Sequence, residues 1–264
     1  MENNGILDAI PLWGLFIVIL VVVLLSVECG YRLGEYRRSR SEQEKEAPVG
    51  TMVGATLGLL AFILAFTFGL AAARFDARRQ VLLDEANAIG TTYLRAGILP
   101  EQADQIRTLL RDYVAARLEA VQSGNIEEGI NRSESIQEQL WSHAEAVAGR
   151  NPNSIVVGLF VQSLNEVIDL HAKRVQAGVR SRIPGAIWLG LFAVAALSLA
   201  AMGYQAGLAR TRRSLAIFAV AITFSVVIEL IADLDRPQQG VLRVGQHALL
   251  DLQRSMNSQS PPNP

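Results

Sequence analysis

Apolar residues are concentrated in four long stretches of this chain, at 10–27, 49–73, 183–208 and 214–232. The first three contain no charged residue, and the fourth contains only Glu229, in its last turn. In an α-helix that rises about 1.5 Å per residue, each stretch reaches about 27 Å or more, close to the thickness of a bilayer core. The pattern therefore predicts four transmembrane helices.

The second stretch has no helix-breaking residue at its end. After Ala73 there is no proline or turn cluster. Apolar side chains instead keep a helical spacing among charged residues, at Phe75, Val81, Leu82, Ala86 and Ile89. We therefore expect one continuous helix over 49–97, which crosses the membrane and continues beyond it.

Residues 74–182, between the second and third spans, show almost none of the alternation typical of β-strands. The pattern here predicts three further helices. The first covers 101–122, the second runs from a capping box at Ser135 and Glu138 to 149, and the third covers 155–182. The expected fold is therefore an all-α membrane protein with four transmembrane helices and a helical insertion domain between the second and third spans.

This pattern divides the chain into five parts. They are 1–48, the first span and a solvated basic loop at 31–46; 49–97, the second-span helix; 98–182, the helical soluble domain; 183–234, a transmembrane hairpin of spans three and four; and 235–264, a tail with an amphipathic piece at 241–252 and a disordered end.

Composition supports a membrane protein and excludes several other classes. Half of the 264 residues are hydrophobic, 19% are charged, and the mean hydropathy is +0.26, so the lipid bilayer is the expected partner. The net charge is −1 and no basic block is interleaved with aromatic residues, which argues against a nucleic-acid partner. Cys29 is the only cysteine, so the chain has no internal disulfide and no cysteine-based zinc site.

No motif of the sequence indicates catalysis. It contains no His-Glu-x-x-His, no glycine-rich phosphate loop ahead of a lysine and no nucleophile elbow. His171 has Glu166 about one and a half helical turns away, and we interpret it as a core or interface histidine rather than a metal ligand. We therefore expect no enzyme activity, no cofactor and no metal site.

Two sets of residues in the second span are candidates for contacts between helices or around a pore. Small residues at steps of three and four form a stripe on which another helix can pack closely: Gly54, Gly58, Ala61, Ala65 and Gly69. Larger apolar residues recur at steps of four, at Phe62, Phe66 and Leu70. If several copies surround an axis, these side chains form rings that gate a channel by dewetting. Ordinary helix packing or lipid contact is the alternative.

A third candidate is the acidic cluster Glu229, Asp233 and Asp235 at the end of the fourth span. Glu229 and Asp233 share a helix face, where like charges repel unless a cation relieves them. The cluster therefore indicates either a bound cation or ion vestibule, or ion pairs with Arg236 or with Arg74 and Arg78.

Three segments resemble the bestrophin-like family of bacterial membrane proteins: GLLAFILAFTFGLAAARFDARRQVLLDEANAIGTTYLRA, SLNEVIDLHAKRV and ELIADLDRPQQGVLRV. The resemblance covers 49–252, and more remotely the order of spans is similar to that of bestrophin anion channels. The small-residue stripe and the long second helix predict a homo-oligomer with this helix innermost. The resemblance implies a pentamer that conducts anions across a bacterial plasma (inner) membrane. The alternatives are a non-conducting membrane scaffold or envelope-sensing protein whose helical domain binds a partner, and a transporter that uses Glu229.

Two features of the chain predict opposite sides of the membrane for the helical domain. Basic residues in the short loops outnumber those after the fourth span, which places these loops in the cytoplasm and the helical domain outside. The bestrophin resemblance implies the reverse. The compact basic turn at Arg210, Arg212 and Arg213 favours the first orientation, because moving it across the membrane is costly.

Overall fold

The computed structural model describes residues 10–40, 46–99, 101–209, 215–236 and 240–258. These residues form eight α-helices and one π-helix, with no strand among them. The chain divides into a membrane unit, 1–75 with 182–243, and a helical unit, 76–181 with 244–264. The prediction of an all-α protein with a helical insertion between spans two and three is confirmed.

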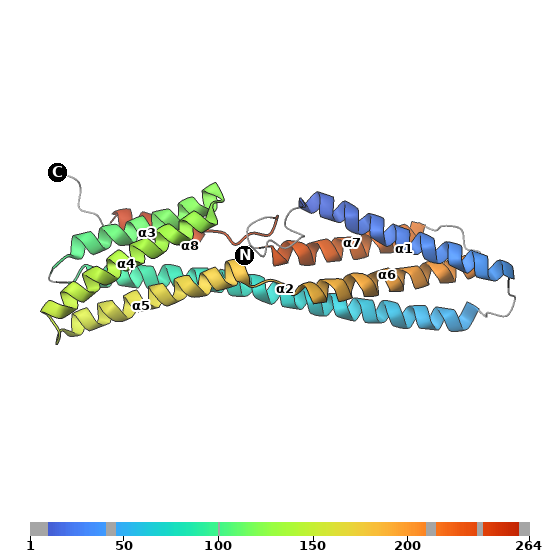
Figure 1. The fold of residues 1–264 in the computed structure, drawn as a ribbon, viewed down its shortest axis with the longest axis horizontal. Coiled ribbons are helices and arrows are strands. Elements are labelled where there is room, and N and C mark those ends of the chain that lie inside the picture. Colours follow the sequence, from blue (N-terminus) through green and yellow to red (C-terminus); the bar gives the residue numbers. More distant parts are fainter. Residues whose placement is uncertain (1–9, 41–45, 100, 210–214, 237–239, 259–264) are drawn as a thin grey trace. The chain divides into compact units, whose positions relative to one another are not determined.

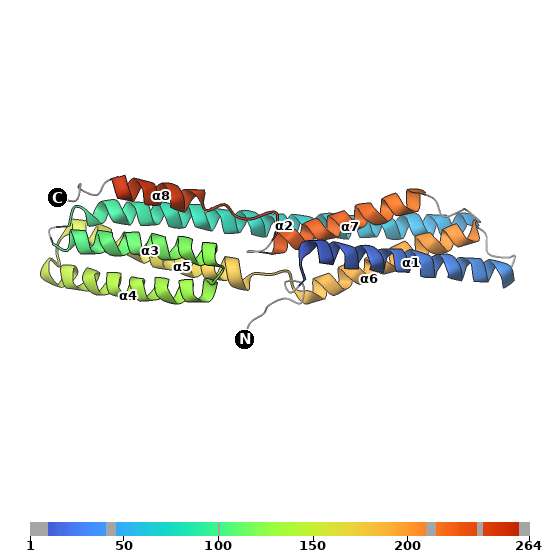
Figure 2. The ribbon, with the colours of Figure 1, turned by 90° about the horizontal axis from the view of Figure 1, so that it is seen from above.

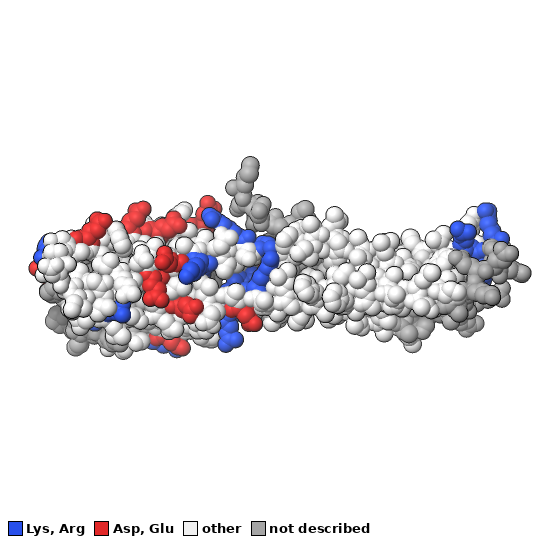
Figure 3. All heavy atoms as spheres, turned by 90° about the horizontal axis from the view of Figure 1, so that it is seen from below, with Lys and Arg blue, Asp and Glu red and all other residues white. Residues whose placement is uncertain are grey.

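The membrane unit consists of α1 (Leu12–Arg40), the first part of α2 (Glu46–Ala96), α6 (Gly185–Leu208) and α7 (Leu215–Asp235). Figures 1 and 2 show these helices running alongside one another. All four are long and apolar enough to cross a membrane. The face of this unit visible in Figure 3 is almost free of charged side chains, whereas the helical unit carries many.

The helix α1 is longer than predicted. We expected a solvated loop at 31–46, but the chain remains helical to Arg40, and only 41–45 lie outside the described residues. Two features favour the extension: the ion pair Glu28–Arg32 spans one turn at 2.8 Å, and the basic residues of the last turn interact favourably with the helix dipole.

Close packing of α1 on α6 depends on glycines of both helices. A Cβ atom on Gly30 or Gly34 would overlap the backbone carbonyls of Ala200 and Tyr204. Gly203 and Gly207 lie equally close to the backbone of α1. Both pairs have the spacing small-x-x-x-small that lets transmembrane helices approach closely. This contact was not predicted from the sequence.

The helical unit consists of the second part of α2, α3 (Ala103–Ser123), α4 (Ile126–Arg150), α5 (Ile155–Val175), the π-helix η1 (Gln176–Arg180) and α8 (His247–Ser258). Its core contains fully buried side chains of five helices, among them Ile89, Tyr113, Leu140, Phe160 and Leu249. Apolar stripes at helical spacing along each helix explain this core.

The predicted start of one helix is wrong. The helix α4 begins at Ile126, so Ser135 and Glu138 lie within it on exposed positions and form no capping box. Gly124, with a positive φ of 75°, ends α3. Gly129 packs closely on Ala120 of α3, so the residues before Ser135 already belong to α4.

Within the amphipathic piece predicted at 241–252, the chain is helical from His247 onward. The amide groups of Val241 and Leu242 donate to the carboxylate of Asp233, which holds them in a non-helical segment. Further on, the hydroxyl of Tyr93 donates to the carbonyl of Met256 at 3.2 Å and ties α8 to α2. The predicted disordered end, 259–264, lies outside the described residues.

Candidate functional site

The membrane-spanning part of α2 buries only one of its sides in the chain. Leu60, Leu64, Thr67 and Ala71 are buried, each 4% exposed or less. The predicted stripe of small residues lies away from this side: Gly54, Gly58, Ala61, Ala65 and Gly69 are all exposed. A Cβ atom added at any of its three glycines would meet no atom of the described chain within 4 Å. Within one chain, therefore, this stripe packs against no other helix that the structure describes.

Phe62 and Phe66 also point away from the buried side. Their side chains are 66% and 73% exposed, and their rings stack with centroids 6.3 Å apart. Leu70, the third predicted member of the set, is half-buried. At about 100° per residue, the two phenylalanines lie about 80° around the helix from the centre of the small-residue stripe. The second span thus presents two adjacent, uncharged and uncovered faces.

The predicted acidic cluster does not form a common site. Asp233 is buried, and its two carboxylate oxygens accept hydrogen bonds from the amides of Val241 and Leu242, each at 3.0 Å. Gly240 faces this carboxylate with a φ of 132°, a conformation that favours glycine. Glu229 is half-buried one turn earlier on α7. Asp233 therefore holds the segment that follows α7 against the end of that helix.

Asp235 binds a different segment, just before α6. Its Oδ1 accepts a hydrogen bond from the amide of Ile183 at 2.9 Å and lies 3.9 Å from Nη1 of Arg74, which is one of the predicted ion pairs. The guanidinium of Arg236 donates to the carbonyl of Ile10 at 2.9 Å. Arg78 belongs to the helical unit. No group of three His, Cys, Asp or Glu side chains among the described residues is placed to hold a metal ion.

A buried polar network, which the sequence analysis missed, lies in the helical unit at Glu85. This side chain has no exposed surface, and its carboxylate pairs with Arg174 and, at 3.5 Å, with Arg117. Its Oε1 accepts a hydrogen bond of 2.9 Å from the hydroxyl of Tyr113. The Tyr113 oxygen lies 3.1 Å from Nδ1 of His171, so this nitrogen carries the hydrogen in the pair.

The charges of this network shift each other's pKa values. Burial raises the pKa of Glu85, but the guanidinium groups of Arg174 and Arg117 outweigh it, and the pKa is lowered overall. Burial, assisted by the positive charge of Arg117, lowers the pKa of His171 to about 4. At neutral pH the network therefore holds an ionised Glu85 and an uncharged His171. The only signal in the sequence was the position of Arg117 and His171 on otherwise apolar helix faces.

Comparison with known proteins identifies the family. The profile of the family described as Bestrophin-like domain matches residues 15–249. The chain belongs to the bestrophin-like family. A search of curated proteins finds no match.

Solved structures share the bestrophin-like fold. A crystal structure of a membrane protein is similar with a TM-score of 0.66 and 16% identity, covering 93% of this chain and 98% of that one. Two variants of a bacterial bestrophin homologue from Klebsiella pneumoniae have TM-scores of 0.66 and 0.67 and identities of 15% and 17%. Each comparison covers 91% of this chain and 98% of the homologue. At these identities the likeness shows the fold of this bestrophin-like protein.

Proposed function

We propose that this bestrophin-like protein is a passive anion channel, formed by several copies around an axis lined by α2. The anion preference and a pentameric state rest on the resemblance to bestrophin anion channels, and a bacterial inner membrane is the expected location. Phe62 and Phe66 form the constriction, and Leu70 extends its apolar lining.

The observation that carries this proposal is the pair of uncovered faces on α2. A helix inside a membrane protein that leaves small residues uncovered can accept a neighbouring helix at close range. If the stripe of Gly54 and Gly58 packs on the next copy, the face about 80° away, with Phe62 and Phe66, turns toward the axis. An apolar ring of this kind controls conduction by excluding water.

Recording from purified protein in planar bilayers tests conduction. We expect anion currents, and a larger conductance for Phe66→Ala because the constriction widens. The matched control is Leu197→Ala, because Leu197 lies on a different helix, α6, and its side chain is 71% exposed. This variant should conduct as the parent does. A correctly folded protein without currents would favour the scaffold instead.

Assembly is tested separately by the mass of the protein in native-like lipid. We expect a homo-oligomer, and Gly58→Leu should weaken it because the longer side chain separates neighbouring helices. A purely monomeric protein at all concentrations would contradict the proposed arrangement, whatever the electrical recordings show.

A further inference from the structure

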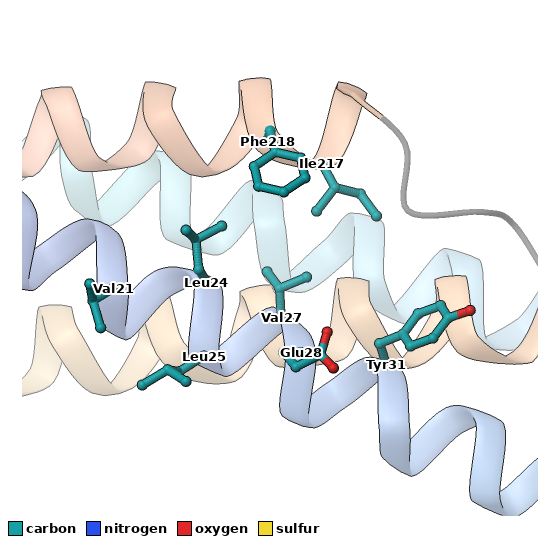
Figure 4. Close-up of a pocket in the computed structure, with 8 residues that line it drawn as sticks. All are labelled: Val21, Leu24, Leu25, Val27, Glu28, Tyr31, Ile217 and Phe218. Atoms are coloured by element: carbon teal, nitrogen blue, oxygen red, sulfur yellow. The ribbon is translucent and has the colours of Figure 1, made fainter.

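An apolar groove of about 390 Å³ lies between α1 and α7 in the membrane unit. In Figure 4, Leu24 and Val27 point from α1 toward α7, and Ile217 and Phe218 point back toward α1. The remaining lining residues all belong to α1: Val21, Leu25, Glu28 and Tyr31. Its volume falls in the range of about 300–1,000 Å³ typical of small-molecule sites.

The polarity of the groove changes along α1. From Val21 to Tyr31 the lining covers about 15 Å of helix at about 1.5 Å per residue. The helix carries no charge from Leu12 to Val27, and Glu28 is its first ionisable side chain. One end of the groove therefore lies at the depth of acyl chains, and the other, with Glu28 and Tyr31, at the depth of head groups.

We propose that this groove binds one phospholipid, with an acyl chain between α1 and α7 and an amine-bearing head group at Glu28. An acyl chain matches the apolar lining of the groove and its gradient of polarity. At the wet end, the ion pair of Glu28 with Arg32, at 2.8 Å, presents one negative and one positive group. These complement the ammonium and phosphate of a zwitterionic head group, whereas an anionic head group meets the carboxylate unfavourably.

Native mass spectrometry of the full-length protein tests the proposal. Purified protein is incubated with mixed micelles that contain phosphatidylethanolamine and phosphatidylglycerol in equal amounts, and lipid adducts are counted per chain. We expect one retained lipid per chain, with phosphatidylethanolamine preferred by about fivefold, the size of a weak surface ion pair.

Two variants and one control separate the parts of the proposal. Leu24→Trp fills the groove and should abolish the adduct, whereas Leu197→Trp, at an exposed position of α6, should retain it. Glu28→Gln leaves the groove open and should bring the preference between the two lipids close to one. An unchanged adduct in Leu24→Trp would overturn lipid binding in the groove. A loss of oligomer without loss of lipid in that variant would also overturn it and assign the groove to a second copy. An unchanged preference in Glu28→Gln would overturn the role of the head group.

Discussion

The hydroxyl of Tyr113 donates a 2.9 Å hydrogen bond to Glu85, a carboxylate with no exposed surface. Tyr113 is on α3 and Glu85 on α2, and Arg174 of α5 pairs with the same carboxylate. Arg174 also donates to the side chain of Gln246, just before α8, at 3.1 Å. One buried anion thus links four parts of the helical unit.

Replacing this anion should strongly destabilise the helical unit. In Glu85→Gln, the buried Arg117 and the part-buried Arg174 remain as cations without this counter-charge, which costs about 3–5 kcal/mol. We expect the thermal midpoint of the full chain in detergent to fall sharply. The control is Glu119→Gln, which breaks the exposed pair with Arg132 and should cost about 1 kcal/mol or less. Equal shifts in both variants would contradict a structural role of the buried anion.

His171 should make the helical unit sensitive to acid. Its pKa is about 4 in the folded protein, against an ordinary value of 6.5, so the unfolded chain binds a proton more readily. The stability that its neutral, buried form contributes is therefore complete above about pH 6.5 and is lost as the pH falls toward 4, by about 3 kcal/mol in all.

The measurement compares thermal midpoints of the parent and His171→Asn across this pH range. Both proteins lose stability through their other groups, but the parent should lose more. Glu134 lies 3.9 Å from Nε2 of His171 and offsets part of the effect if it approaches the protonated ring. Parallel curves for the two proteins would show that His171 does not titrate between the folded and unfolded states as inferred.

The glycine contact between α1 and α6 should be intolerant of even one methyl group. Gly203→Ala places a Cβ atom against the carbonyl of Val27, and we expect a loss of about 1–3 kcal/mol from the forced separation of the helices. On the same helix, a Cβ atom at Gly190 meets nothing within 4 Å in the described chain. Gly190→Ala should therefore leave the thermal midpoint in detergent unchanged or slightly higher. Similar losses in both variants would assign the effect to backbone flexibility instead.

The membrane spans, the length of α2 and one ion pair could be predicted from the sequence alone. Long uncharged stretches are sufficient to locate membrane spans, and the absence of a breaker after Ala73 correctly predicted that α2 continues to Ala96. The pair Arg74–Asp235 was among the expected alternatives because both residues flank the ends of spans. Local patterns of this kind depend on one segment at a time.

The Glu85 network could not be predicted in the same way. Glu85 lies among Asp84 and other charged residues on a helix that looks solvated in the sequence, and it becomes buried only when α3 and α5 pack against it. Likewise, Asp233 looks like part of an acidic cluster in the sequence. Its partners are the backbone amides of Val241 and Leu242, which directly follow Gly240 with its positive φ, and no local pattern reveals them. Partners of this kind are set by tertiary structure.

The orientation of the protein in the membrane can be determined by labelling single cysteines on either side of the second span. The helix α1 ends with Arg37, Arg38 and Arg40, and the basic residues of both short loops favour the cytoplasm for this end. Because α1 extends beyond the sole thiol, Cys29, a reporter in its last turn gives a clearer answer. Ser39 is exposed there, and Ser135 is exposed in the helical unit, on the other side of the second span.

In a Cys29→Ser background, Ser39→Cys should resist a membrane-impermeant maleimide in cells whose inner membrane is intact and react once the membrane is permeabilised. Ser135→Cys should react in both conditions, because one membrane span separates it from Ser39. The reverse result, labelling at position 39 and protection at position 135, would place the helical unit in the cytoplasm. In that orientation the basic residues Arg210, Arg212 and Arg213, which lie outside the described residues, are on the outer side. The arginines that flank the helical unit, such as Arg74 and Arg182, then outweigh the short loops in setting topology.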